Sequence, residues 1–227
     1  MKKNRLFLFL SKTVRIFTKP YNTVFQGDKP DEPCVYIVNH AGAVGPVDMC
    51  AKFYARDRTR IWCNNGMMER KEVPAYVRQD YWWKPGCLLE PVFTRTIPYI
   101  AALLVPPVLK SAPTIPVYHD QRVMLTLRES IKTLKSNQNV VIFPEQPSGW
   151  RSHETRINMG WIKLCELWVR TTGRKINICP VYIDTDKHVF HIFEPIIYSS
   201  SALSESEETQ IAGYLASCLR NETNVIA

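Results

Sequence analysis

The clearest structural signal lies in residues 34–48, which read CVYIVNHAGAVGPVD. The unbroken apolar run Cys34–Val38 is typical of a strand buried on both faces of a parallel sheet. A loop of small residues follows it, and Pro46 and Asp48 favour the start of a helix over residues 48–58. His40 therefore stands at the end of a buried strand, which is where α/β folds usually place their sites.

Strand and helix patterns alternate along the rest of the chain. Strands are predicted over residues 61–63, 114–118, 139–143, 175–183 and 188–193, and helices over 121–136, 155–172 and a last segment ending near residue 220. This alternation predicts an α/β fold, with one layered domain over residues 21–227 and a mostly parallel central sheet flanked by helices. Residues 81–116 are apolar and rich in proline, and their pattern predicts no element.

The composition excludes several classes of protein. The chain has 227 residues, of which 45% are hydrophobic, so it is too apolar to be disordered. Its 7 cysteines contain no C-x-x-C spacing, which argues against a zinc ribbon, and we expect reduced core thiols and no metal or cofactor. We find no run near the roughly 20 apolar residues that a membrane-spanning helix needs. The net charge of +8 predicts an anionic partner.

The charge surplus is densest at the N-terminus. Residues 1–20 hold six basic residues and no acidic one. On a helical wheel one face carries Arg5, Lys12, Arg15 and Lys19, and the opposite face carries Leu6, Leu10, Val14 and Phe17. This pattern predicts a basic amphipathic helix in contact with an anionic membrane, on the cytoplasmic side, without crossing it. The alternative is a helix that packs on the domain with its charges in water.

Three predicted strands end in residues that can carry chemistry. His40 and Asp48 follow the first strand, and a carboxylate near a histidine can orient the ring and make it a better general base. Glu145 directly follows the strand that ends at Phe143, with Arg151 farther along the same loop. Arg122 opens a helix after the strand at 114–118, and its guanidinium suits phosphate.

The order of these blocks resembles the glycerolipid acyltransferase family, whose members acylate lysophosphatidic acid. NHAGAVGPVD resembles the family's N-H-x4-D motif, VYHDQR its strand-D-R block, and FPEQPSGWRS its F-P-E-G-T-R-S block. A fourth block, a strand with a central proline, resembles residues 178–183, ICPVYI. The resemblance spans roughly residues 20–195.

This resemblance implies an acyltransferase that moves an acyl group from an acyl-CoA or acyl-carrier-protein thioester to a lysophospholipid hydroxyl. His40 would act as the general base and Asp48 would orient it. Glu145 would bind acceptor hydroxyls or hold the loop, and Arg122 and Arg151 would bind the acceptor phosphate. No covalent acyl-enzyme is expected, because the chain has no G-x-S-x-G elbow.

The chain departs from the family pattern in two blocks. The family's acid comes five residues after the histidine, where this chain has Gly45, and Asp48 comes eight residues after it. In a continuous helix eight residues would span about 12 Å, so a His40–Asp48 pair requires the intervening loop to fold back. The third block has lost its glycine and adjacent arginine.

Three other functions stay open, and one of them is a hydrolase that uses the same histidine. The altered blocks allow a non-catalytic or differently specific lipid-binding protein on the same scaffold. Nucleic-acid binding would use the positive charge, but the basic residues cluster beside apolar ones at the N-terminus, and no recognition motif for nucleic acid is found. We therefore expect a membrane surface, a lysophospholipid and an acyl thioester as partners, and no nucleic acid.

Overall fold

The computed structural model describes residues 4–31, 33–41, 44–79, 83, 86–145 and 157–220. Within these residues eight strands form one sheet. Seven lie in the order β1-β7-β6-β2-β5-β3-β4, and β8 also pairs with β6. The strands are β1 (Asn22–Phe25), β2 (Cys34–Val38), β3 (Thr59–Asn64), β4 (Thr114–Val117), β5 (Asn139–Ile142), β6 (Ile176–Asp184), β7 (Val189–Ile192) and β8 (Ile196–Tyr198).

The centre of the sheet is parallel. Strands β6, β2, β5, β3 and β4 all run in one direction, and only β7 and β8 pair with β6 in the antiparallel sense. Because parallel strands end at the same edge, the segments that leave β2, β5 and β4 emerge on one side of the molecule.

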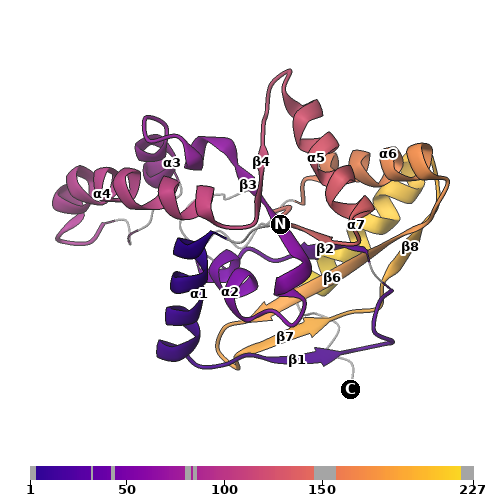
Figure 1. Cartoon of the computed structure of the whole chain (residues 1–227), viewed down its shortest axis with the longest axis horizontal. Coiled ribbons are helices and arrows are strands. Elements are labelled where there is room, and N and C mark those ends of the chain that lie inside the picture. Colours follow the sequence, from indigo (N-terminus) through magenta and orange to yellow (C-terminus); the bar gives the residue numbers. More distant parts are fainter. Residues whose placement is uncertain are drawn as a thin grey trace.

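Helices cover both faces of this sheet (Figure 1). They are α1 (Arg5–Phe17), α2 (Val44–Lys52), α3 (Val73–Gln79), α4 (Glu90–Ser111), α5 (Val123–Lys135), α6 (Ile162–Thr172) and α7 (Glu205–Leu219). Helices α5, α6 and α7 pack on one face, α2 packs on the other, and α3 and α4 lie together at one end of the molecule (Figure 1).

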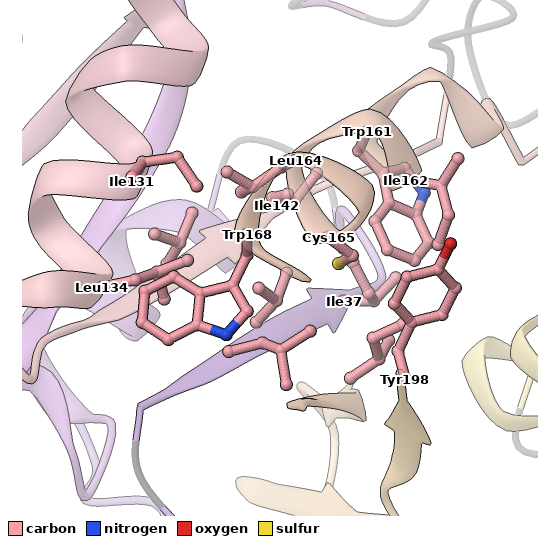
Figure 2. Packing of buried hydrophobic residues seen from close by; sticks show 14 of the residues in the cluster. Ile37, Ile131, Leu134, Ile142, Trp161, Ile162, Leu164, Cys165, Trp168 and Tyr198 are labelled. Carbon is pink, nitrogen blue, oxygen red and sulfur yellow. The ribbon is translucent and has the colours of Figure 1, made fainter. Parts of the chain in front are cut away.

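Strand β2 is buried along its whole length because it faces a core on each side. Val35 and Ile37 belong to the core under α5, α6 and α7, and Tyr36 and Val38 belong to the core under α2. In the first core Trp168 of α6 lies between the sheet and α5 (Figure 2). Since successive side chains of a strand point to opposite faces, this run of β-branched and aromatic residues fits the central position.

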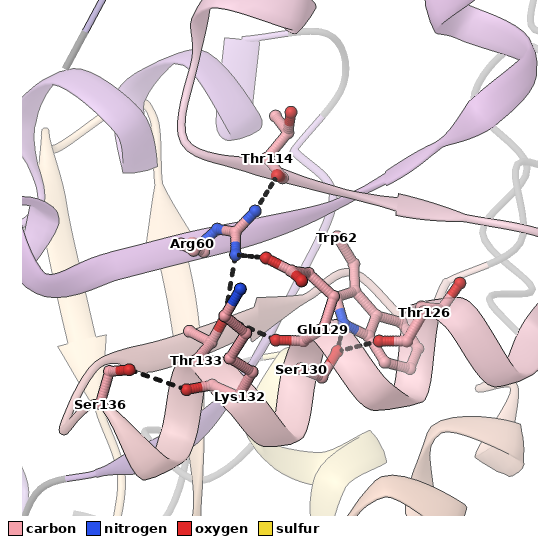
Figure 3. Close-up of polar contacts among 9 residues, drawn as sticks. All are labelled: Arg60, Trp62, Thr114, Thr126, Glu129, Ser130, Lys132, Thr133 and Ser136. Carbon is pink, nitrogen blue, oxygen red and sulfur yellow. Dashed lines mark hydrogen bonds and ion pairs between the residues drawn. The ribbon is translucent and has the colours of Figure 1, made fainter. Parts of the chain in front are cut away.

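Polar contacts fix α5 against the far half of the sheet. The Arg60 guanidinium on β3 forms an ion pair with Glu129 and donates hydrogen bonds to Thr133 and to the Thr114 carbonyl (Figure 3). The Trp62 Nε1 donates to Ser130 Oγ at 2.8 Å. These contacts fix the second half of α5 against β3 and the start of β4.

The structure confirms the predicted α/β class and corrects several elements. The helix predicted over 48–58 is wrong at both ends, because α2 begins at Val44 and stops at Lys52. The predicted N-terminal helix is present, but its inward face is formed by Phe7, Leu10 and Val14, so the ends of the predicted apolar face are exposed. Residues 81–116, for which the pattern predicted no element, contain the longest helix that the structure describes, α4.

Candidate functional site

Asn39 fixes the point at which the chain leaves β2. Its side chain is buried, its Oδ1 accepts a hydrogen bond from the Ile183 backbone N–H at 2.6 Å, and its Nδ2 donates to the Ile183 carbonyl at 3.4 Å. The amide thereby continues the β2–β6 ladder by one residue after the strand has ended. This contact fixes the backbone immediately before His40.

His40 is held from the other side by Glu145, which follows β5. The His40 backbone N–H donates a hydrogen bond to Glu145 Oε2 at 2.7 Å. Burial raises the pKa of Glu145, and this rise is partly offset by the hydrogen bond from His40 and by the charges of His40 and Arg220. A single carboxylate therefore ties together the ends of two neighbouring parallel strands.

The half-buried His40 imidazole packs edge to face against Phe143, with ring centroids 5.4 Å apart. Phe143 lies two residues before Glu145, so the same segment contacts both the ring and the backbone of His40. Glu145 also forms an antiparallel bridge with Ile157, and the Asn158 N–H donates to the Pro144 carbonyl at 3.0 Å. The segment after β5 is thus anchored to the segment that leads into α6.

The chain turns sharply after His40. Ala41 has φ of 43°, in the left-handed region that a residue with a side chain rarely adopts. Helix α2 then begins close to this turn, and a Cβ at Gly45 would overlap the carbonyl oxygen of His40. Gly45 occupies the position at which the family motif has its acid, so the path of the backbone here leaves no room for that side chain.

Asp48 is not brought to His40. The Asp48 carboxylate points to Lys52, one turn along α2, with Oδ1 2.8 Å from Nζ. Both side chains are nearly fully buried, at 3% and 7% exposure, and no ion pair within the described residues joins Asp48 to His40. The predicted His40–Asp48 dyad is absent from this structure, because Asp48 lies within α2 and its carboxylate forms an ion pair with Lys52.

Tyr21 completes the surroundings of this buried pair. Lys52 Nζ lies 4.7 Å from the centre of the Tyr21 ring, and burial together with the nearby Asp48 carboxylate raises the pKa of Tyr21. Together Tyr21, Asp48 and Lys52 join the segment before β1 to α2 and stabilise the position of α2, the helix that follows His40.

Arg122 lies at the same edge of the sheet but far from His40. Its strand, β4, is three strands from β2, which corresponds to about 14 Å at the usual spacing of strands. The exposed guanidinium forms a forked ion pair with Asp120, at 2.7 Å for the shortest contact, and this pairing lowers the pKa of Asp120 to about 2. Arg122 is thus in contact with a carboxylate and not with the residues around His40.

Of the remaining predicted site residues, Glu145 is placed at His40 and Arg151 lies outside the described residues. The structure adds two residues whose roles the sequence did not reveal. Asn39 fixes the backbone before His40 through its side-chain hydrogen bonds to Ile183. Arg220, which follows α7, is near enough for its charge to act on Glu145. Its separation of 75 positions from Glu145 left no local signal.

The assembled site is an imidazole whose backbone is held on both sides, at the carboxyl end of a parallel sheet. Such a ring can act as a general base toward a hydroxyl group placed within hydrogen-bond distance of it. No ion pair joins a carboxylate of the described residues to the ring, although the charges of Glu145 and His40 interact.

No protein-family model and no curated protein sequence matches this chain. Among solved structures, it is similar to the 1-acyl-sn-glycerophosphate (LPA) acyltransferase PlsC from Thermotoga maritima. The TM-score is 0.51 and the identity is 15%, over 98% of this chain and 79% of that chain. At this identity the similarity establishes a shared fold.

Proposed function

We propose that this chain is an O-acyltransferase that moves a fatty acyl group from an acyl thioester to the hydroxyl of a lysophospholipid. The observation that carries the proposal is the placement of His40. In a fold shared with a lysophosphatidic acid acyltransferase, the histidine follows a central parallel strand, and its backbone is held by Asn39 and Glu145.

In the proposed reaction, the acceptor hydroxyl oxygen attacks the carbonyl carbon of the thioester. The new C–O bond forms and the C–S bond breaks, and His40 takes the hydroxyl proton and passes it to the departing thiolate. A positioned base of this kind typically contributes about 10²–10⁴-fold to the rate. The donor is acyl-CoA or acyl-carrier protein, and the reaction needs no covalent intermediate on the chain.

The other residues take supporting roles in this proposal. Glu145 is a positioning residue for His40, since its carboxylate accepts the His40 backbone N–H. Arg151 remains the proposed ligand of the acceptor phosphate, whereas Arg122, which is far from His40 and paired with Asp120, is no longer proposed for this role. Asp48 takes no part in proton transfer, because its carboxylate is paired with Lys52. The membrane provides the acceptor, with α1 as the proposed contact for anionic lipid.

The test is direct. Purified protein is incubated with acyl-CoA donors and a panel of lysophospholipids in vesicles, and the acylated product is measured by mass spectrometry. We expect transfer by the native chain and a loss of about 100-fold or more in His40→Ala. Full activity in His40→Ala would overturn the proposal.

His119→Ala is the matched control for this experiment. His119 also follows a parallel strand of the same sheet, but it is exposed and lies on the loop after β4. It should keep the native rate. Equal losses in the two variants would mean that removing any histidine from this edge disturbs the fold.

A second function is favoured by one specific observation, which is that no carboxylate in the described residues pairs with the His40 ring. On that basis the scaffold would bind lysophospholipid without transferring acyl groups. Saturable binding of lysophospholipid, with no product from any donor and with binding unchanged in His40→Ala, would identify this function.

A further inference from the structure

Helix α4 exposes an apolar stripe, which the exposed polar residues Arg95 and Thr96 interrupt in the N-terminal half of the helix. The outward positions recur in pairs one turn apart, and their large apolar members are Val92, Tyr99, Ile100, Leu103, Leu104 and Val108. Leu88 and Leu89, just before the helix, extend the stripe. In water such a surface is costly, and exposed patches of this kind mark interaction sites.

The opposite face of α4 is occupied by the protein itself. Ala101 and Ala102 pack with Val73 and Val77 of α3 and with Trp83. Lys110 of α4 also pairs with Glu69, which lies before α3, at 3.3 Å. The Arg78 guanidinium of α3 lies 5.5 Å from the centre of the ring of Tyr99, an exposed member of the stripe. By length and composition alone α4 is long and apolar enough to cross a membrane, which corrects the expectation that no segment of the chain is. However, crossing would require it to leave α3, so the packing favours a helix that lies along a surface.

Helix α1 packs beside α4 and supplies positive charge (Figure 1). Its exposed residues include Arg5, Lys12 and Arg15 together with Phe9 and Phe17. This charge indicates which partner covers the α4 stripe. An anionic bilayer attracts the cations while its hydrocarbon takes the apolar side chains. A second copy of the chain would instead place like charges close together.

We propose that α4 lies along the surface of an anionic bilayer with its outward stripe inserted among the lipid chains, beside α1. Both helices contribute to membrane binding: α1 through electrostatic attraction to anionic lipid, and α4 through insertion of apolar side chains. The bilayer then lies next to α2, which contacts α1 and begins four residues after His40. This proposal is independent of acyl transfer, because membrane binding is measured without turnover.

The experiment is sedimentation of the full chain with vesicles of phosphatidylcholine and phosphatidylglycerol. Ile100→Ala removes three carbons from a side chain that is 57% exposed, so we expect vesicle affinity to fall about tenfold. Adding Leu103→Ala and Leu104→Ala should bring the loss to about 100-fold or more. Ile197→Ala is the matched control, because Ile197 is 63% exposed on β8, at the other end of the molecule from α4 (Figure 1).

The salt dependence of vesicle binding distinguishes the contribution of α1 from that of α4. Lys12→Gln with Arg15→Gln should weaken binding about 30-fold at low salt, and this loss should disappear at high salt. The loss in the α4 variants should persist at high salt. Thermal unfolding of each variant verifies that it is folded.

Three results would overturn the proposal. The first is native affinity in the triple α4 variant, and the second is an equal loss in Ile197→Ala. The third is a dimer, detected by light scattering in the absence of lipid, that Ile100→Ala dissociates, because the stripe would then be an interface between copies of the chain.

Discussion

Replacing Lys52 by Met should destabilise the domain severely, because it leaves the buried Asp48 carboxylate without its ion-pair partner. Two unit charges 2.8 Å apart attract each other by roughly 6 kcal/mol at an effective dielectric constant of 20. Most of this attraction offsets the desolvation of both groups, but removal of one partner forfeits it and leaves the other desolvated. The side chains are 7% and 3% exposed, so water cannot compensate. We expect a loss of about 3–5 kcal/mol.

The assay is a double-mutant cycle measured by urea unfolding of Lys52→Met, Asp48→Asn and the double variant. Asp48→Asn should also destabilise, because Lys52 is then the uncompensated charge. The double variant buries an amide and a thioether in place of two ions, and we expect it to recover to within about 2 kcal/mol of the native chain. The coupling free energy between the two positions should therefore exceed about 2 kcal/mol.

The same cycle also tests the assignment of Asp48 away from proton transfer. If the pair is structural, the double variant should keep acyl transfer within a few-fold of the native rate. The reasoning is refuted if Asp48→Asn is stable but loses activity, or if the two substitutions simply add. The first result would mean that the carboxylate serves His40, and the second would mean that Asp48 and Lys52 do not stabilise each other.

Three further predictions concern the backbone around His40. Glu145→Gln should keep the hydrogen bond from the His40 N–H. Because burial raises the pKa of Glu145 in the folded chain, folding favours the protonated carboxyl. The native chain should therefore lose stability relative to the variant as the pH rises above about 4.5, measured by urea unfolding. Gly45→Ala should destabilise by about 1–3 kcal/mol, seen as a lower midpoint of thermal unfolding, because the new Cβ overlaps the His40 carbonyl. Asn39→Ala should cost about 1–3 kcal/mol in urea unfolding, because the Ile183 N–H loses its acceptor, and should lower the turnover rate more than it raises KM.

The sequence was informative where local pattern and tertiary position agree. Strand β2 was readable because a parallel strand buried on both faces has an unbroken apolar run, and Cys34–Val38 is such a run. Strands β1 and β8 were missed, since they have four and three residues and exist through pairing with β7 and β6. Pairing partners distant in sequence leave no local signal.

Helix α4 was missed for a different reason. Pro98, Pro106 and Pro107 lie inside it, and an interior proline usually costs a helix about 3 kcal/mol. Propensity therefore argued against a helix over this segment. The packing of its inner face on α3 overrides that local preference, and packing of this kind is a tertiary effect.

For Asp48 the family motif and the local helix pattern predict different partners. The resemblance required an acid near His40, and Asp48 was the nearest available. The sequence also held the correct partner, because Asp48 and Lys52 are four residues apart, the spacing of an ion pair on one helix face. Since α2 begins at Val44, both residues fall within one helix, and the local pair forms in preference to a contact across the turn at Ala41.

The arrangement of α1, α2 and α4 links the candidate site to the proposed membrane face. Helix α1 contacts both of the others, and α2 begins immediately after the turn that carries His40. Val44 and Val47, in the first turn of α2, are also exposed apolar residues. A lysophospholipid held in the bilayer by its acyl chain would therefore present its headgroup hydroxyl near His40 without leaving the membrane. If this geometry operates, the triple α4 variant should lose transfer to acceptors in vesicles but keep it with a short-chain acceptor dissolved in water.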